Sequence, residues 1–415
     1  MRLCSCVPLL LTLTACGPKA QAADPSLEIL EQGSDSTGNP SAPDPASSTL
    51  APRTPTAHPP SRWSEVTATA LTRAVAPEKA RLLEPCAELD QGLMDAAQQM
   101  AEHLARGQGL ADNDEVVFET RVAGVAQVWP RVWALVGERD TTKQASQLSD
   151  WLASFNDGGK RRCGVGLQQG PAGPAVVALA LDAIAELEPV PRRARVGQWV
   201  EIQAPLLVSA SKAEVVALGP RGAPFSVPTS LSSGVVHARV PVDAPGPWLI
   251  QVLPTLDSGP RPAAEALIYV DQEPPDKFQS SPVPGEDQGT GNDSNALLAM
   301  LNGARLSERL GALKLNPRLT RAAEKHATRM LESGRVAHDL GDGDPAERVA
   351  REGLTPRITG ENVAHADTLV RAHRALWSSP SHRGNLLLAR FTEVGIGVAE
   401  RPGSGVWVCE VFGAF

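Results

Sequence analysis

The chain has 415 residues, of which 42% are hydrophobic and 21% are charged, and its formal net charge is −8. Because one domain usually takes roughly 100–200 residues, we expect more than one domain. The acidic balance, with no basic block, argues against a nucleic-acid partner, since phosphate contacts need a cationic surface. The 36 prolines predict stiff connectors between globular parts.

Residues 1–16 show the pattern of an export signal that ends in a lipid attachment site. Arg2 supplies a positive charge, residues 7–13 are apolar, and small residues precede Cys16. The apolar run is about half of the roughly 20 residues that a membrane-spanning helix needs, so cleavage is favoured over spanning. The segment resembles the bacterial lipobox, which implies acylation of Cys16 and attachment of the exported protein to a membrane. Gly17 favours the outer membrane or the cell surface, and an ordinary secretory signal is the alternative.

Two segments are predicted to be connectors. Residues 17–62 are dominated by Pro, Ser, Thr, Ala and Gly and hold almost no large apolar side chain, which predicts a disordered tether. Residues 272–293 contain Pro-Pro and Pro-Val-Pro-Gly runs, so we expect a linker there. The rest of the chain then divides into modules at 63–187, 188–271 and 294–415.

Residues 188–271 are predicted to form a β-sandwich. Short apolar or alternating runs, such as 200–204 and 248–253, are bounded by Gly and Pro. The Asp-Ala-Pro-Gly-Pro approach to Trp248 resembles bacterial immunoglobulin-like domains. No chemical cluster lies here, so we expect a spacer.

Residues 63–187 are predicted to form a mostly helical module that repeats part of the C-terminal one. The matched segments are 89–101 with 315–327 and 163–167 with 394–398. A degenerate copy of the C-terminal module explains both matches, and chance alignment of Ala-rich amphipathic helices is the alternative. Only Glu138 loosely echoes Glu361, so we expect the copy to be structural.

The cysteines that follow the signal offer one intramolecular pair. Cys86 and Cys163 fall within the same predicted module, whereas Cys409 lies in another. An exported protein can keep a disulfide, so Cys86 with Cys163 is the natural pair. Buried, unpaired cysteines acting as small hydrophobic residues are the alternative.

Residues 294–415 carry three motifs after an amphipathic helix and the isolated His338. The motifs are Gly360-Glu361-Asn362, Trp377-Ser378-Ser379-Pro380-Ser381-His382-Arg383 and Phe391-Thr392-Glu393-Val394-Gly395-Ile396-Gly397. Their order resembles the CAP domain, also called the SCP domain, of bacterial proteins. Periodicity predicts helices at 296–304 and 319–330 and strands at 394–398 and 406–412. The resemblance implies an α+β chain whose last module is a three-layer α-β-α sandwich.

The resemblance also implies a ligand cleft in which His338 and Glu361 converge. The other cleft candidates are Asn362, Ser379, His382 and Arg383. An imidazole and a carboxylate suit Zn²⁺, and His382 would be the third protein ligand that a catalytic zinc site usually has. Glu361 and His382 are the catalytic candidates. Two simpler explanations stay open: His338 bonds its own loop, and His382 orients Glu361 or caps a turn.

The sequence departs from the eukaryotic form of this pattern, in which a second Glu follows the Trp and a second His precedes an aromatic-Thr pair. Ser378 or Ser379 lies near the first of these positions, and Arg390 occupies the second. We therefore expect a non-catalytic module that binds a small apolar, lipid or cell-envelope ligand, with no certain cofactor. The alternative is a metal-dependent hydrolase of peptide or envelope polymer that holds zinc at His338, Glu361 and His382.

Overall fold

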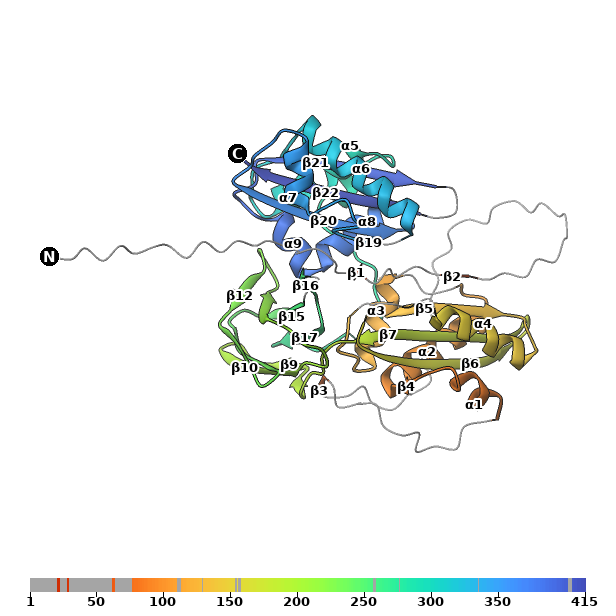
Figure 1. The fold of residues 1–415 in the computed structure, drawn as a ribbon. Helices are drawn as coiled ribbons and strands as arrows, with labels where there is room; N and C mark the ends of the chain where they lie inside the picture. Colours follow the sequence, from red (N-terminus) through yellow and green to blue (C-terminus); the bar gives the residue numbers. More distant parts are fainter. Residues whose placement is uncertain are drawn as a thin grey trace.

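The computed structural model describes residues 21–22, 28–29, 62–63, 77–109, 113–128, 130–153, 155, 158–256, 259–275, 277–334, 336–401 and 405–415. Figure 1 shows an N-terminal domain, a β-sandwich and a C-terminal domain that lies against the other two. The predicted signal with Cys16, and nearly all of the predicted tether, lie outside the described residues. No helix within the described ranges is long and apolar enough to cross a membrane.

A four-stranded sheet forms the centre of the C-terminal domain. Its order is β18-β21-β22-β20, in which β18 is parallel to β21 and the other neighbours are antiparallel. The strands are β18 (Lys314–Leu315), β20 (Ile358–Ala366), β21 (Glu393–Glu400) and β22 (Val406–Ala414). The helices are α5 (Ser294–Ser307), α6 (Pro317–Ser333), α7 (Pro345–Arg351), α8 (Leu369–Ser378) and α9 (Pro380–Leu386). Outside this sheet, β19 (Val336–Ala337) pairs with β1 (Gln21–Ala22).

Helices cover both faces of this sheet, so β22 is buried along its whole length. Alternation of side chains sends Val408 and Phe412 into a core with α5 and α8. It sends Cys409 and Val411 into a second core with α6 and α7. The domain is therefore a three-layer α-β-α sandwich (Figure 1).

Helix α6 packs directly on β21 because glycine leaves room for its backbone. Asn316 caps the helix by accepting a hydrogen bond from the Leu319 backbone N at 3.3 Å, and Gly334 ends it with a φ of 65°. A Cβ at Gly395 would lie 2.0 Å from the carbonyl carbon of Leu319. This close approach fixes the height above the sheet of His326, which lies on the buried side of α6.

The N-terminal domain is built on a five-stranded sheet, so it is less helical than the expected mostly helical module. The sheet order is β2-β5-β7-β6-β4. Its strands are β2 (Glu28–Ile29), β4 (Glu88–Leu89), β5 (Arg131–Val136), β6 (Lys160–Gly170) and β7 (Gly173–Ala183), and its helices are α1 (Pro77–Leu83), α2 (Gln91–Ala105), α3 (Asn113–Val122) and α4 (Thr141–Ala153). Strand β7 is buried on both faces and has no alternating pattern, so periodicity does not distinguish it from a buried helix.

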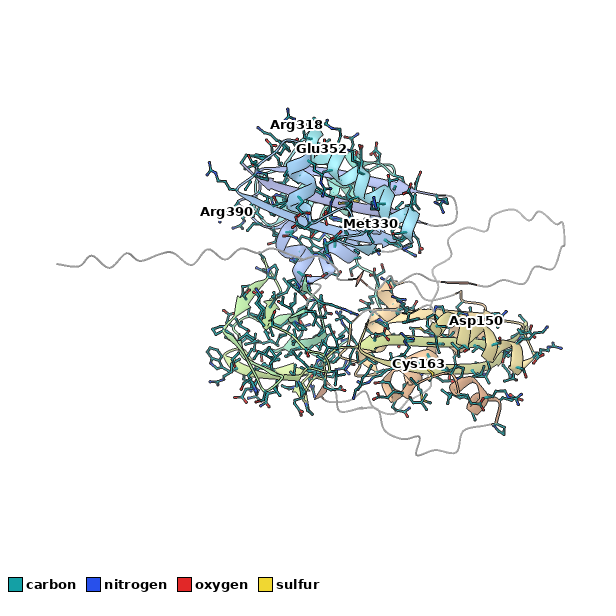
Figure 2. The ribbon with its side chains drawn as sticks, in the orientation of Figure 1. Asp150, Cys163, Arg318, Met330, Glu352 and Arg390 are labelled. Carbon is teal, nitrogen blue, oxygen red and sulfur yellow. A yellow bond between two sulfur atoms is a disulfide. The ribbon has the colours of Figure 1, made fainter. Side chains whose placement is uncertain are left out.

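A disulfide joins Cys86 to Cys163, the pair that the sequence singles out. Their Cα atoms are 5.7 Å apart, within the normal range for a disulfide. Cys163 lies in β6, in the middle of the N-terminal domain (Figure 2). The bond therefore ties the segment before β4 to the central sheet.

Apart from β2, the N-terminal sheet has the strand order of the C-terminal sheet, with β4, β6, β7 and β5 in the places of β18, β21, β22 and β20. In each, a two-residue strand runs parallel to the first strand of a hairpin, with Leu89 opposite Cys163 and Leu315 opposite Val394. In each domain, a glycine in the first strand of the hairpin packs against the backbone of the helix that follows the two-residue strand. A Cβ at Gly164 would lie 2.3 Å from the Leu93 carbonyl carbon, matching the contact made at Gly395.

Two sheets of residues 188–271 close over one core, as expected for a sandwich. One sheet has the order β10-β14-β13 and the other β12-β11-β15-β17-β9, with β16 added to β15. The strands are β8 (Val190–Pro191), β9 (Arg193–Ala194), β10 (Gln198–Pro205), β11 (Lys212–Leu218), β12 (Phe225–Val227), β13 (Thr229–Ser232), β14 (Val235–Val242), β15 (Gly246–Leu256), β16 (Gly259–Pro260) and β17 (Ala264–Val270). β3 (Arg62–Trp63) pairs with β8, and Trp63 joins this core, although the sequence placed residue 63 in the preceding module.

Part of the predicted linker belongs to the C-terminal domain. The 3-10 turn η1 (Glu286–Gln288) follows Pro284, whose carbonyl oxygen lies 2.9 Å from His373 Nε2 of α8. Glu286 also pairs with Arg374 of α8 at 2.6 Å. The same Arg374 lies 3.7 Å from Asp114 of the N-terminal domain, so this segment contributes to the contact between domains.

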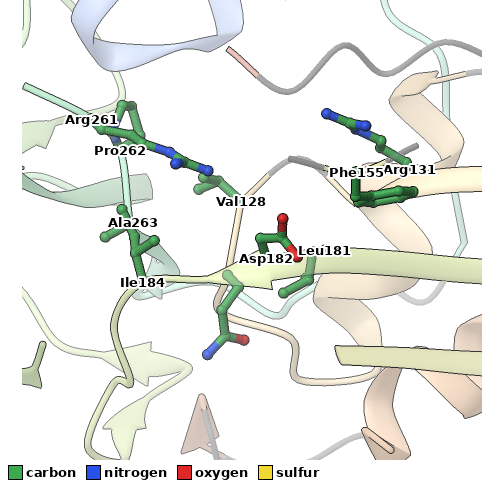
Figure 3. Close-up of a pocket in the computed structure, with 10 residues that line it drawn as sticks. Val128, Arg131, Phe155, Leu181, Asp182, Ile184, Arg261, Pro262 and Ala263 are labelled. Carbon is green, nitrogen blue, oxygen red and sulfur yellow. The ribbon is translucent and has the colours of Figure 1, made fainter. Parts of the chain in front are cut away.

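A small cavity lies where the N-terminal domain meets the β-sandwich (Figure 3). Arg131, Phe155 and Asp182 line it from one side, and Arg261 and Ala263 from the other. Its volume is about 10 Å³, which is room for about one water molecule. It is too small for an organic ligand.

Candidate functional site

Glu361 lies at the centre of a buried polar network on the α6 side of the sheet. It is on β20 and is 1% exposed. His338 Nδ1 donates to its Oε1 at 2.8 Å, Arg348 Nη2 donates to its Oε2, and the Cys409 thiol donates to the same Oε2 at 3.4 Å. Burial raises the pKa of Glu361, but the Arg348 guanidinium and the His338 hydrogen bond outweigh it and lower the pKa to about 2.

Arg348 neutralises the carboxylate from helix α7. Besides Glu361, its guanidinium donates to the backbone oxygens of His338, at 2.7 Å, and Gly343. Asp344 and Glu347 form a reciprocal capping box that begins α7 one turn before Arg348. Sequence reasoning missed Arg348, although the Asp-Pro-Ala-Glu run before it is a recognisable helix start.

His326 and Asp342 extend the network toward α6. His326 Nε2 lies 2.7 Å from the Ala337 carbonyl oxygen, and its Nδ1 lies 2.9 Å from Asp342 Oδ2. Both partners are oxygen atoms of other segments of the domain, so the imidazole ring is fixed on both sides. Burial raises the pKa of Asp342, but the His326 hydrogen bond, with the charges of His326 and Arg348, lowers it to about 2.

A second polar cluster lies on the opposite face of the same strands. Asn362 donates from Nδ2 to Glu410 Oε2 at 3.0 Å and to the His382 backbone oxygen at 3.3 Å. Asn385 of α9 donates to Asn362 Oδ1 at 3.0 Å and to the Glu361 backbone oxygen at 3.1 Å. Among the described residues, none donates to Glu410 Oε1. Burial raises the pKa of Glu410 to about 7.

Ser379 and His382 form a pair at the start of α9. The Ser379 hydroxyl lies 2.9 Å from His382 Nδ1. Burial, together with the nearby His338, lowers the pKa of His382 to about 3, so this imidazole is neutral at pH 7. Arg383 lies apart from the pair, because its guanidinium stacks 3.8 Å from the Trp377 ring centroid and lies 3.4 Å from Glu308.

The structure thus brings together only some of the predicted cleft residues. His338 and Glu361 are in direct contact, whereas Asn362 points to the other face of β20. Arg348, His326, Glu410 and Asn385 contribute contacts that the sequence reasoning did not anticipate.

The predicted zinc ligands do not fit a metal ion. Both carboxylate oxygens of Glu361 already accept hydrogen bonds, and one of them receives a buried cation, Arg348. In the part of the chain that is described, no group of three or more His, Cys, Asp or Glu side chains has the arrangement of a metal site. A second cation beside Arg348 would be repelled, so we derive no step through zinc.

A groove of about 570 Å³ runs between α6 and α7, next to the network. This volume is within the usual range for ligand sites. Its lining residues are Ala322, Glu324, Lys325, Thr328, Arg329, Glu332, Asp342, Arg348, Arg351 and Glu352. Eight of these ten carry a charge, so the groove suits a polar ligand. One of them, Glu352, directly follows α7 and is labelled in Figure 2.

The strand register identifies the matching places in the N-terminal domain. Since Cys163 corresponds to Val394, the counterpart of Glu361 on β5 is Val132, and Glu138 lies beyond that strand. The correspondence of Glu138 to Glu361 that the sequence suggested is therefore wrong. The counterparts of Glu361, His326 and Cys409 are Val132, Met100 and Val177, all buried.

Comparison with known proteins identifies the C-terminal domain. Residues 298–411 match the CAP family model, described as the cysteine-rich secretory protein family. The chain therefore contains a CAP domain at these residues. A search of curated proteins finds no match.

Solved structures with local similarity include three bacterial proteins. An outer surface protein of Borrelia burgdorferi is 22% identical, with 29% of this chain and 90% of that chain covered and a TM-score of 0.28. An extracellular protein containing a SCP domain from Bacillus anthracis is 17% identical, with coverage of 55% and 88% and a TM-score of 0.28. A cysteine-rich secretory protein from Staphylococcus aureus is 13% identical, with coverage of 56% and 84% and a TM-score of 0.25.

Proposed function

We propose that this chain is an exported, lipid-anchored protein whose CAP domain binds a ligand of the cell envelope and performs no chemistry. The observation that carries the proposal is the pairing of Glu361 with a buried cation. Its carboxylate is buried and ionised, and it accepts hydrogen bonds from His338 and Arg348. Such a group holds a site in shape, and its low pKa makes it a weak acceptor for a substrate proton.

Neither of the two candidate catalytic groups, Glu361 and His382, has a pKa suited to catalysis near neutral pH. An effective general base has a pKa near the working pH. The pKa of Glu361 is about 2 and that of His382 about 3. His382 therefore accepts a proton from Ser379 too weakly to generate a nucleophile, despite the 2.9 Å contact.

The groove supports a polar envelope ligand over a small apolar or lipidic one. Most of its walls are charged, and an apolar ligand there would desolvate those charges without compensation. The groove also reaches Arg348 and Asp342, so a ligand bound in it would contact the network around Glu361. Its opposite charges suit a polymer that carries both ammonium and carboxylate groups.

We further propose that the N-terminal domain is a degenerate CAP-like repeat with a structural role, and that the β-sandwich is an immunoglobulin-like spacer. The shared strand order and the matching glycine contacts support the repeat. Replacement of the polar centre by Val132, Met100 and Val177 supports its loss of function. The tether and the lipid at Cys16 would then carry the CAP domain away from the membrane.

A measurement of product formation distinguishes a binding protein from a hydrolase. Purified full-length wild type and Glu361→Gln are incubated with cell-wall polymer and with a peptide mixture, with and without Zn²⁺, and new reducing ends and free amines are measured. We expect no product from either protein. Zinc-dependent product that Glu361→Gln abolishes would establish a hydrolase and overturn the proposal.

Binding is measured by sedimentation with insoluble cell-wall polymer. Arg329→Glu reverses a charge inside the groove, whereas Arg318→Glu makes the same change on the same helix outside it. We expect the first variant to weaken co-sedimentation and the second to leave it unchanged. Equal effects of both variants would show that the groove is not the binding site. Separately, Cys16→Ser is expected to move the protein out of the membrane fraction.

A further inference from the structure

The outer face of the sheet β10-β14-β13 exposes a tryptophan that the fold does not require. Trp199 is 57% exposed. The other described tryptophans are all buried: Trp63, Trp133, Trp151, Trp248, Trp377 and Trp407. An exposed indole forgoes a large gain from burial and presents a flat apolar surface on this strand face.

Trp199 begins a series of three cross-strand rows with different chemistry. Trp199 lies opposite Pro241, and Glu201 lies opposite Arg239. In the third row, Gln203 lies opposite His237, which in turn lies opposite Ser230 on β13. Rows two residues apart are spaced by about 7 Å, so the three rows span about 14 Å. The face is apolar at one end and rich in hydrogen-bonding groups at the other.

The charges on this face cancel. The Arg239 guanidinium lies 5.2 Å from the Trp199 ring centroid and 3.6 Å from the Glu201 carboxylate. This pair holds the indole on one side and leaves no net charge to attract an anionic or cationic polymer. The complementary ligand is electrically neutral, has a flat apolar side, and carries many hydroxyl or amide groups.

We propose that this face of the β-sandwich binds a neutral polysaccharide of N-acetylated sugars. The C–H face of one pyranose ring would cover the Trp199 indole, since aromatic side chains bury large apolar area in a fixed plane. Hydroxyl and acetamido groups of the neighbouring rings would bond Glu201, Arg239 and Gln203. The sandwich would then attach the chain to a glycan independently of the CAP groove, beyond its role as a spacer.

The test measures calorimetric binding of an N-acetylglucosamine hexamer to purified full-length protein. Trp199→Ala removes the stacking surface, and Leu306→Ala is the matched control, because Leu306 is 74% exposed on α5 in another domain. We expect wild type and Leu306→Ala to bind equally and Trp199→Ala to bind at least about tenfold more weakly. Gln203→Ala should cause a smaller loss.

Three results would overturn the assignment. They are no heat from wild type at millimolar sugar, equal affinity in Trp199→Ala, and a wild-type dimer in sedimentation that Trp199→Ala converts to monomer. The last result would make this face an interface between copies of the chain. Arg329→Glu should leave hexamer binding unchanged, so this test and the groove test fail independently.

Discussion

Glu410 and Glu361 are buried carboxyl groups on adjacent strands, and their environments push their pKa values in opposite directions. Glu410 faces α8 and α9 with one amide donor, whereas Glu361 faces α6 and α7 with a guanidinium and an imidazole. Exchange of each for glutamine keeps the shape and removes the charge. We expect Glu410→Gln to stabilise the CAP domain at pH 8 and Glu361→Gln to destabilise it.

The size of the stability change expected for Glu410→Gln follows from proton linkage. Its pKa is raised in the folded protein from 4.5 to about 7, so the folded state holds a proton that the unfolded state loses. Its contribution to stability is complete below pH 4.5 and is lost as the pH rises through 7, by about 3 kcal/mol in all. Glutamine avoids this loss, but its extra amide hydrogens lack an acceptor, which costs about 1 kcal/mol. We therefore expect a net gain of about 2 kcal/mol at pH 8.

Glu361→Gln is the matched control with the opposite sign. The pKa of Glu361 is lowered from 4.5 to about 2, so its contribution is present above pH 4.5 and is lost as the pH falls toward 2. The substitution also leaves Arg348 buried without its counter-ion. Breaking a buried pair in this way costs about 3–5 kcal/mol, so we expect a large loss at pH 8 and a smaller one near pH 3.

Hydrogen exchange of peptides from β22, followed by mass spectrometry from pH 5 to pH 8, measures the stability of this domain within the whole chain. The exchange rates are corrected for the intrinsic effect of pH. The reasoning is refuted if Glu410→Gln opens more readily than wild type at pH 8. The reasoning is equally refuted if the difference in stability between Glu410→Gln and wild type does not change with pH.

Three further changes test other contacts. Arg348→Met should destabilise the CAP domain by about 3–5 kcal/mol at pH 7. The loss should be smaller near pH 4, because burial without the guanidinium raises the pKa of Glu361 in the variant and lets it take up a proton. An unchanged pH profile in hydrogen exchange would refute the pairing. Cys86→Ser with Cys163→Ser opens a loop with a sequence separation of 77 and should destabilise the N-terminal domain by about 4 kcal/mol in urea unfolding, with Cys409→Ser as the control for thiol loss. Gly395→Ala places a Cβ 2.0 Å from the Leu319 backbone and should prevent soluble folding of the CAP domain, whereas Gly311→Ala, with open space around it, should not.

Sequence patterns predicted the elements whose packing is periodic. The stripe of α6 and the hairpin of β21 and β22 follow from helical and strand periods, and the structure contains both. The three-layer arrangement was expected from the family resemblance. In the N-terminal domain only residues 163–167 were matched to a strand, because β6 is glycine-rich and β7 is uniformly apolar, so neither shows a strand period.

The polar network was harder to predict because its pairs join distant parts of the chain. Arg348 meets Glu361 only after α7 and β20 have packed together, and neither residue alone indicates the pairing. Glu410 did leave a signal, since it is the single charged residue in the apolar run of β22. A carboxylate in such a strand is expected to be buried and to have a raised pKa.

The two α-β-α domains of this chain give an internal comparison that bears on the purpose of the network. In the N-terminal domain, the same strand order closes over apolar residues at the places of Glu361, His326 and Cys409. Buried ion pairs usually add no stability over apolar side chains of similar size, because desolvation offsets their attraction. The fold therefore does not need the charges that the CAP domain keeps. Since those charges extend through Arg348 and Asp342 to the groove beside α6, we propose that their value to the protein lies in shaping that groove for a polar ligand.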